Sequence, residues 1–210
     1  GSKIDVDVNL FPNEANKAIK LHLPVKGRDY SGEQIFGAEK LFENGNECIA
    51  HDYVWLEEED GKCLQILTPS NYGSSYRDGE IRLTLVKTST YCAHPVPNRP
   101  LLREGIFIGK IDQGQRDFSF RMDVVEKETL KRNADEFTET PYALNIFPTI
   151  DEKCDNGLTI ECSNPLISTV TIRKSVQKEG YIFRLFNNGE KEQSATVACG
   201  EASIALRFGK

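Results

Sequence analysis

The sequence lacks several features that would define a function class at once. None of its apolar runs approaches the roughly 20 residues needed to cross a bilayer, so it predicts no transmembrane helix and no membrane partner. It has no internal repeat, no low-complexity segment and no basic cluster, and its formal net charge is −6 over 210 residues. Because nucleic-acid binders normally carry a basic patch, we expect no nucleic-acid partner.

Metal-binding and disulfide patterns are also missing. The six cysteines form no CxxC pair, and no histidine is directly beside one. Six cysteines are too few for a disulfide scaffold of this size, so we expect reduced thiols and a cytoplasmic protein, with a single bridge left open. His22, His51 and His94 are far apart in sequence and are interpreted as surface or strand-face residues.

Signatures of catalysis are equally scarce. Glycoside hydrolysis needs two carboxylates on rigid elements of one pocket, and no pair of acids stands out. Ser74 and Ser75 follow Gly73, but no strand predicted from the sequence leads into them as in a nucleophile elbow. The acids of residues 57–60 are consecutive, which favours a solvated turn over a calcium loop. The sequence therefore predicts no catalytic residue and no metal ligand in this chain.

What is present is an abundance of strand patterns. Apolar and polar residues alternate with a period of two, and glycine-containing turns separate the runs. In the first part these runs are Ile4–Leu10, Ile19–Val25, a hairpin over 51–67, Ile81–Val86 and Phe118–Met122. In the second part they are 158–162, 168–176, 181–186 and 202–208, with a less regular run at 194–199. Residues 26–29 are expected to form a turn, and the Glu-, Lys- and Leu-rich residues 124–137 the one helix.

One segment combines groups that suit sugar hydroxyls. Asp112, Gln113 and Arg116 supply an acid, an amide and a guanidinium around Gly114, at the end of a proline-rich loop that spans 88–114. Pro95, Pro97 and Pro100 restrict this loop, which favours a shaped connection. The alternative interpretation is a plain turn with an Asp–Arg pair, and the sequence leaves both open.

The order and spacing of several motifs resemble the C-terminal β region of the glycoside hydrolase family 38 α-mannosidases. They are residues 34–37 with Trp55 downstream, Tyr72-Gly73, residues 79–87, residues 91–95, residues 111–118 and residues 184–187. The resemblance covers nearly the whole chain, and Lys87 is a minor departure because bacterial members often have Arg there.

This resemblance implies an all-β fold: a large antiparallel supersandwich, galactose-mutarotase-like, over residues 3–150, and a small, truncated β-sandwich over 155–210. The break is expected at 149–155. Gly1-Ser2 resembles a cloning remnant, so a longer parent chain is expected.

The family's parent enzymes are retaining, metal-dependent exo-α-mannosidases. Their nucleophilic Asp and their divalent metal, usually zinc, belong to an N-terminal α/β domain that is absent from this chain. The resemblance implies that this chain holds no cofactor and that it completes the active site of the catalytic domain. It also implies a mannoside bound at the interface between the two domains. Whether the parent enzyme is a homo-oligomer is left open. Two alternative interpretations remain. One is a stand-alone carbohydrate-binding module or lectin, and the other is a purely structural β domain.

Overall fold

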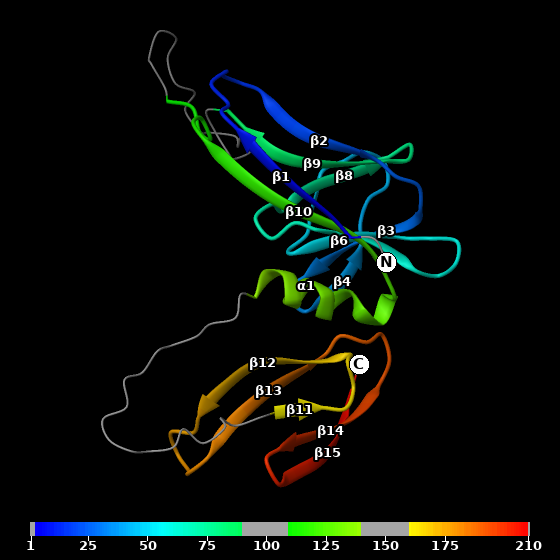
Figure 1. The fold of residues 1–210 in the computed structure, drawn as a ribbon, viewed down its shortest axis with the longest axis vertical. Helices are drawn as coiled ribbons and strands as arrows, with labels where there is room; N and C mark the ends of the chain where they lie inside the picture. The colour runs from blue at the N-terminus through cyan, green and yellow to red at the C-terminus, as the bar shows by residue number, and fades with distance from the viewer. Residues whose placement is uncertain (1–2, 90–108, 140–159, 210) are drawn as a thin grey trace, which may run out of the picture. The chain divides into compact units, whose positions relative to one another are not determined.

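The structure, a computed structural model, describes residues 3–89, 109–139 and 160–209 (Figure 1). The chain forms two compact units, Gly1–Val124 and Val125–Lys210. Strands dominate both units, and the described residues contain one α-helix. The predicted all-β class is therefore confirmed.

The first unit contains a six-stranded antiparallel sheet. Its outermost pair joins the first strand of the chain to the last strand of the unit, in register from Ile4 opposite Met122 to Leu10 opposite Arg116. The strand order is β1 (Ile4–Leu10), β10 (Arg116–Val125), β7 (Cys63–Leu67), β6 (Tyr53–Glu57), β3 (Arg28–Gln34) and β4 (Gly37–Lys40).

A second, four-stranded sheet packs against the first through a shared core. Its order is β2 (Ala18–Pro24), β9 (Glu80–Lys87), β8 (Gly73–Arg77) and β5 (Cys48–Ile49). The first sheet contributes the buried side chains of Leu56, Ile66 and Phe120, and the second contributes those of Ile81 and Leu83. These are the inward positions of period-two strands, so the alternation in the sequence is what produces the sandwich.

The second unit is smaller and begins with helical structure. A 3₁₀ turn (η1, Lys127–Thr129) leads into α1 (Leu130–Thr138). A three-stranded sheet then has the order β11 (Ile160–Cys162), β14 (Gln193–Cys199), β15 (Ala202–Phe208), and β12 (Ile167–Lys174) pairs with β13 (Tyr181–Asn187). All of these pairings are antiparallel.

Two sequence predictions need correction. Residues 26–29 are not all turn, because β3 begins at Arg28; Asp29 has a positive φ of 53° and the register with β6 shifts there, so this strand lacks a clean alternation. The helix starts later than 124, because β10 continues to Val125 and the 3₁₀ turn η1 precedes α1, which begins at Leu130. In addition, the sequence did not predict β8, whose residues Ser74 and Ser75 are polar yet buried.

The predicted break at 149–155 lies outside the described residues and stays a prediction. The two compact units divide earlier, at Val124–Val125, so α1 groups with the second unit. No sheet of the described strands combines strands from both sides of 149–155. In the described ranges, no helix has the length and apolar character that crossing a membrane requires.

Candidate functional site

A ladder of polar pairs on the β1–β10 ribbon leads to the predicted site. The Arg121 guanidinium donates to both carboxylate oxygens of Asp5, at 2.6 and 3.1 Å, and Ser119 Oγ donates to Asp7 at 2.7 Å. The hydrogen bond and the charge of Arg121 hold the pKa of the Asp5 carboxyl below its ordinary value. The ribbon is thus fixed by side chains on its exposed face as well as by its backbone, and it presents the start of β10 in a defined position.

The segment just before β10 bends sharply. Asp112 and Gly114 both have positive φ, 56° and 100°, a conformation that Gly adopts freely and that Asp tolerates better than most residues. The Gly114 N–H donates to the Pro12 carbonyl at 3.1 Å, and the Ile111 N–H donates to the Ser89 carbonyl at 3.1 Å. The segment is therefore held at its centre and at its start by distant parts of the first unit.

The three predicted site residues make different contacts. Arg116 Nη2 lies 3.8 Å from Asp112 Oδ1, and the two side chains are 42% and 48% exposed. A pair this long and this exposed contributes little to stability, so both groups remain accessible to a ligand. Gln113 Nε2 donates to the Asn13 carbonyl at 2.9 Å, which leaves its carbonyl oxygen as an acceptor. The structure brings Asp112 and Arg116 together, and their proximity to a substrate stays a prediction.

Sequence reasoning missed an aromatic neighbour of this segment. Phe11 directly precedes Pro12 and Asn13, which bind the segment, and its side chain is 71% exposed. Lys110 Nζ also donates to Asn16 at 3.2 Å, so the β1–β2 connection and residues 110–114 are joined at several points. Exposed aromatic rings can pack against the faces of sugars, and the side chains of residues 112–116 can hydrogen-bond to their hydroxyls. Only the tertiary contacts relate Phe11 to this segment, because Phe11 and Gln113 are 102 residues apart in the sequence.

Other residues considered in the sequence have structural roles. Ser74 is buried, and its Oγ accepts a 2.7 Å hydrogen bond from the Tyr30 hydroxyl, whose pKa is raised by burial. His22 Nδ1 lies 2.9 Å from Glu80 Oε1 on an exposed sheet face, and the His51 ring makes an edge contact with Tyr72. His94 and the loop prolines lie outside the described residues.

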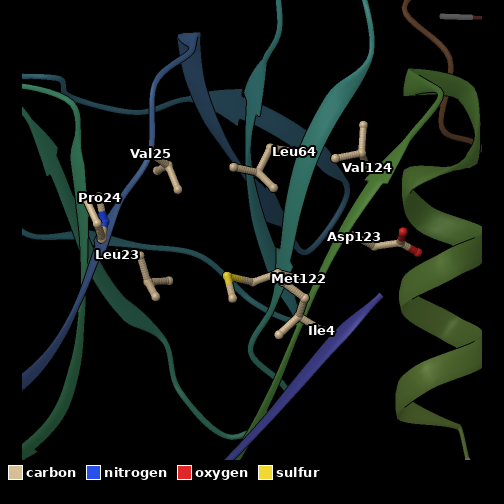
Figure 2. Close-up of a pocket in the computed structure, with 8 residues that line it drawn as sticks. All are labelled: Ile4, Leu23, Pro24, Val25, Leu64, Met122, Asp123 and Val124. Atoms are coloured by element: carbon tan, nitrogen blue, oxygen red, sulfur yellow. The ribbon is translucent and has the colours of Figure 1, made fainter. Parts of the chain in front are cut away.

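A cavity of about 310 Å³ lies at one end of the sandwich (Figure 2). Its walls are apolar side chains of both sheets, including Leu23, Leu64 and Met122. The only carboxylate in its lining, that of Asp123, is buried, lies 3.5 Å from Lys3 Nζ and points away from the apolar side chains in Figure 2. A ligand site normally has several polar groups that converge on it, so this cavity is better explained as the open end of the core.

Within residues 3–89, 109–139 and 160–209, no cluster of three or more His, Cys, Asp or Glu side chains is placed to hold a metal ion. Four cysteines of this part, Cys48, Cys63, Cys162 and Cys199, are free thiols.

Comparison with known proteins finds likeness at the level of structure. No protein-family model matches the sequence, and no curated protein sequence matches it. Among solved structures, an α-mannosidase from Enterococcus faecalis V583 is similar over 94% of this chain, with a TM-score of 0.70 and 13% sequence identity. The match spans 23% of that enzyme's chain. The chain therefore has the fold of a part, about a quarter, of an α-mannosidase.

Proposed function

We propose that this chain is the non-catalytic C-terminal part of a retaining, metal-dependent exo-α-mannosidase. The observation that carries the proposal is the likeness of almost the entire chain to less than a quarter of an α-mannosidase. The motifs at residues 72–73, 79–87 and 111–118 support it independently, because they come from the sequence alone. Its partner would be the catalytic α/β domain of the same protein, which would hold the nucleophilic Asp and the zinc.

In this proposal residues 112–116 lie at the interface with the catalytic domain and contact the mannoside. The carboxylate of Asp112 can accept hydrogen bonds from sugar hydroxyls, and the guanidinium of Arg116 can donate to their oxygens. The backbone is fixed at Gly114 by the bond to Pro12 and just before Asp112 by the bond from Ile111 to Ser89, so little conformational entropy is lost when substrate binds. The chain then orients the substrate, while bond cleavage is left to the partner domain.

The test uses the full-length protein from which this chain derives. We expect it to hydrolyse an aryl α-mannoside, and we expect Arg116→Ala and Asp112→Asn each to lower kcat/KM roughly ten- to hundredfold, the cost of about 1.5–3 kcal/mol for a lost hydrogen bond to a charged group. Arg132→Ala is the control, because Arg132 makes an ion pair on α1, with Glu136, that is also exposed, more so than the Arg116–Asp112 pair.

Three outcomes contradict the proposal. One is a full-length protein without α-mannosidase activity. Another is hydrolysis of the aryl α-mannoside by the 210-residue chain alone with added zinc, which would mean that this chain contains the catalytic residues. The third is a loss of activity in the two variants that only follows a loss of melting temperature, since residues 112–116 would then be structural.

A second candidate, a carbohydrate-binding module, is favoured by one observation, the exposed Phe11 two residues before Asn13, whose carbonyl accepts from Gln113. Calorimetric titration of the isolated chain with mannose oligosaccharides separates the two. Low-micromolar binding that Phe11→Ala abolishes would favour the module, whereas an active-site part should bind weakly without its catalytic domain.

A further inference from the structure

The last strand of the second unit ends its sheet with a long, regular edge. β15 pairs with β14 over its whole length, from Ala202 opposite Cys199 to Phe208 opposite Gln193, without a bulge. Among the described strands none pairs with its other side. Alternate residues of an edge strand direct their N–H and C=O groups outward, so this edge is a template for a further strand.

Four of the other edge strands that the structure describes carry features that normally prevent such pairing. Two of them are very short, with two residues in β5 and three in β11. β2 has a register irregularity and ends in Pro24, and β12 is irregular between Thr169 and Thr171. β15 has seven residues, no proline and no irregularity, and Arg207 is its one charged residue.

The side chains of β15 also point to a missing neighbour. Ile204 lies opposite Val197, which is buried, and so belongs to the face of the sheet that forms the core. Ile204 is nevertheless 58% exposed, because the described chain places no strand beside it. A further strand would cover this side chain and satisfy the backbone groups together.

We propose that this neighbour is β15 of a second copy of the chain, paired antiparallel about a two-fold axis at Ala205. The symmetry places Ile204 opposite Leu206 of the copy, so that two apolar side chains meet on the core face. The small side chain of Ala205 faces itself at the axis, where a larger one would have to share the space. The interaction is independent of the proposed function.

The charges of the strand suit this register. Arg207 falls opposite Ser203 of the copy, so no like charges face each other across the axis. Glu201, in the turn before β15, lies next along the chain and provides an acid near the copy's Arg207. Arg207 already pairs with Glu192 at 2.6 Å in its own chain, which keeps the guanidinium on the outer face.

One strand pair is a small contact. Stable protein interfaces bury about 1,200–2,000 Å² in total, and a pair of seven-residue strands buries less. We therefore expect a reversible dimer whose population rises with protein concentration.

Sedimentation velocity of the 210-residue chain between about 5 and 500 µM measures this equilibrium. We expect the sedimentation coefficient to rise with concentration for the native chain. Ile204→Lys should raise the dimer dissociation constant about tenfold or more, since a lysine on the inward face of an edge blocks pairing. Ile182→Lys is the matched control on β13, where the isoleucine is 42% exposed, and should leave the equilibrium unchanged.

A cross-link tests the register. In the proposed dimer the two residues 205 lie about 4.5–5.5 Å apart at Cα, within disulfide range, so Ala205→Cys should form a covalent dimer under mild oxidation. Ser203→Cys should not exceed the background of the native chain, because position 203 faces position 207. Three outcomes overturn the proposal: a native chain that stays monomeric, a dimer that Ile204→Lys leaves intact, or equal cross-linking at positions 203 and 205. A monomeric native chain would mean that the edge of β15 pairs with another segment of a longer protein.

Discussion

The two units differ in how completely they bury their apolar side chains. In the first, sheets of six and four strands enclose a core whose Tyr30, Leu56, Ile66 and Ile81 have no exposed surface. In the second, sheets of three and two strands bury fewer apolar side chains. Ile167, Ala195 and Val197 are buried, but Ile172, Tyr181 and Ile204 remain exposed. The same alternating pattern produces strands in both units, so the number of strands per sheet decides whether a closed core forms.

The first unit also carries a charged cluster on its surface. On the outer face of the four-stranded sheet, Glu47 accepts a hydrogen bond from Lys87 at 2.7 Å and lies 3.7 Å from Lys20 Nζ. Side chains from two strands are therefore joined through one partly buried carboxylate. Such groups link the stability of the first unit to pH, which gives a second way to compare the units.

The largest expected effect comes from truncating the closed core. Leu56→Ala should lower the free energy of unfolding of the first unit by about 2–5 kcal/mol, because the deleted methyl groups leave a cavity. Leu185→Ala, at a half-buried position of β13, should cost clearly less. Urea unfolding followed by tryptophan fluorescence for the first unit and by circular dichroism for both measures the difference. Equal losses would mean that the second unit is closed in solution.

A smaller effect is expected from one buried hydrogen bond of the first unit. Tyr30→Phe removes the hydroxyl that donates to Ser74 and should cost about 1–2 kcal/mol, since it leaves the buried Ser74 oxygen unpaired. Adding Ser74→Ala should recover part of the loss. A double-mutant cycle by urea unfolding measures the coupling, and additive losses would show that the two hydroxyls do not interact.

The next prediction concerns acid. Burial alone would raise the pKa of Glu47, but the hydrogen bond from Lys87 and the charges of Lys20 and Lys87 outweigh it, and the pKa lies below its ordinary value. A lowered pKa adds stability above the unfolded-state value that is lost as pH falls through the folded one. Glu47→Gln should therefore flatten the decline in stability below about pH 4.5, measured by urea unfolding at stepped pH. An unchanged slope would contradict the assignment.

The smallest effect is expected at the proposed substrate-contacting pair. Arg116→Ala should change the free energy of unfolding of the chain by less than about 1 kcal/mol, because its partner Asp112 is 3.8 Å away and both are exposed. Thermal unfolding monitored by circular dichroism would detect a larger loss of stability. A larger loss would show that residues 112–116 brace the fold, and would weaken their proposed role at a substrate.

The sequence alone determined the elements whose pattern is local. β1, β2 and β9 were predicted because apolar and polar residues alternate along them, and this period places one face in the core. The glycine-containing turns expected between these runs include Gly61 and Gly79, which do have positive φ, a conformation that most other residues avoid. Local steric preferences and local periodicity are properties that a linear sequence carries in full.

Only the tertiary structure decided the elements whose partners are distant. β3 and β8 are polar and were not predicted as strands, yet each forms between two neighbours whose ladders satisfy its backbone. The site shows the same limit. The sequence identified Asp112, Gln113 and Arg116, but not Phe11, which precedes the two residues, Pro12 and Asn13, that Gly114 and Gln113 bind. The pairing of strands sets which distant residues meet, and the sequence does not show which strands become neighbours in a sheet.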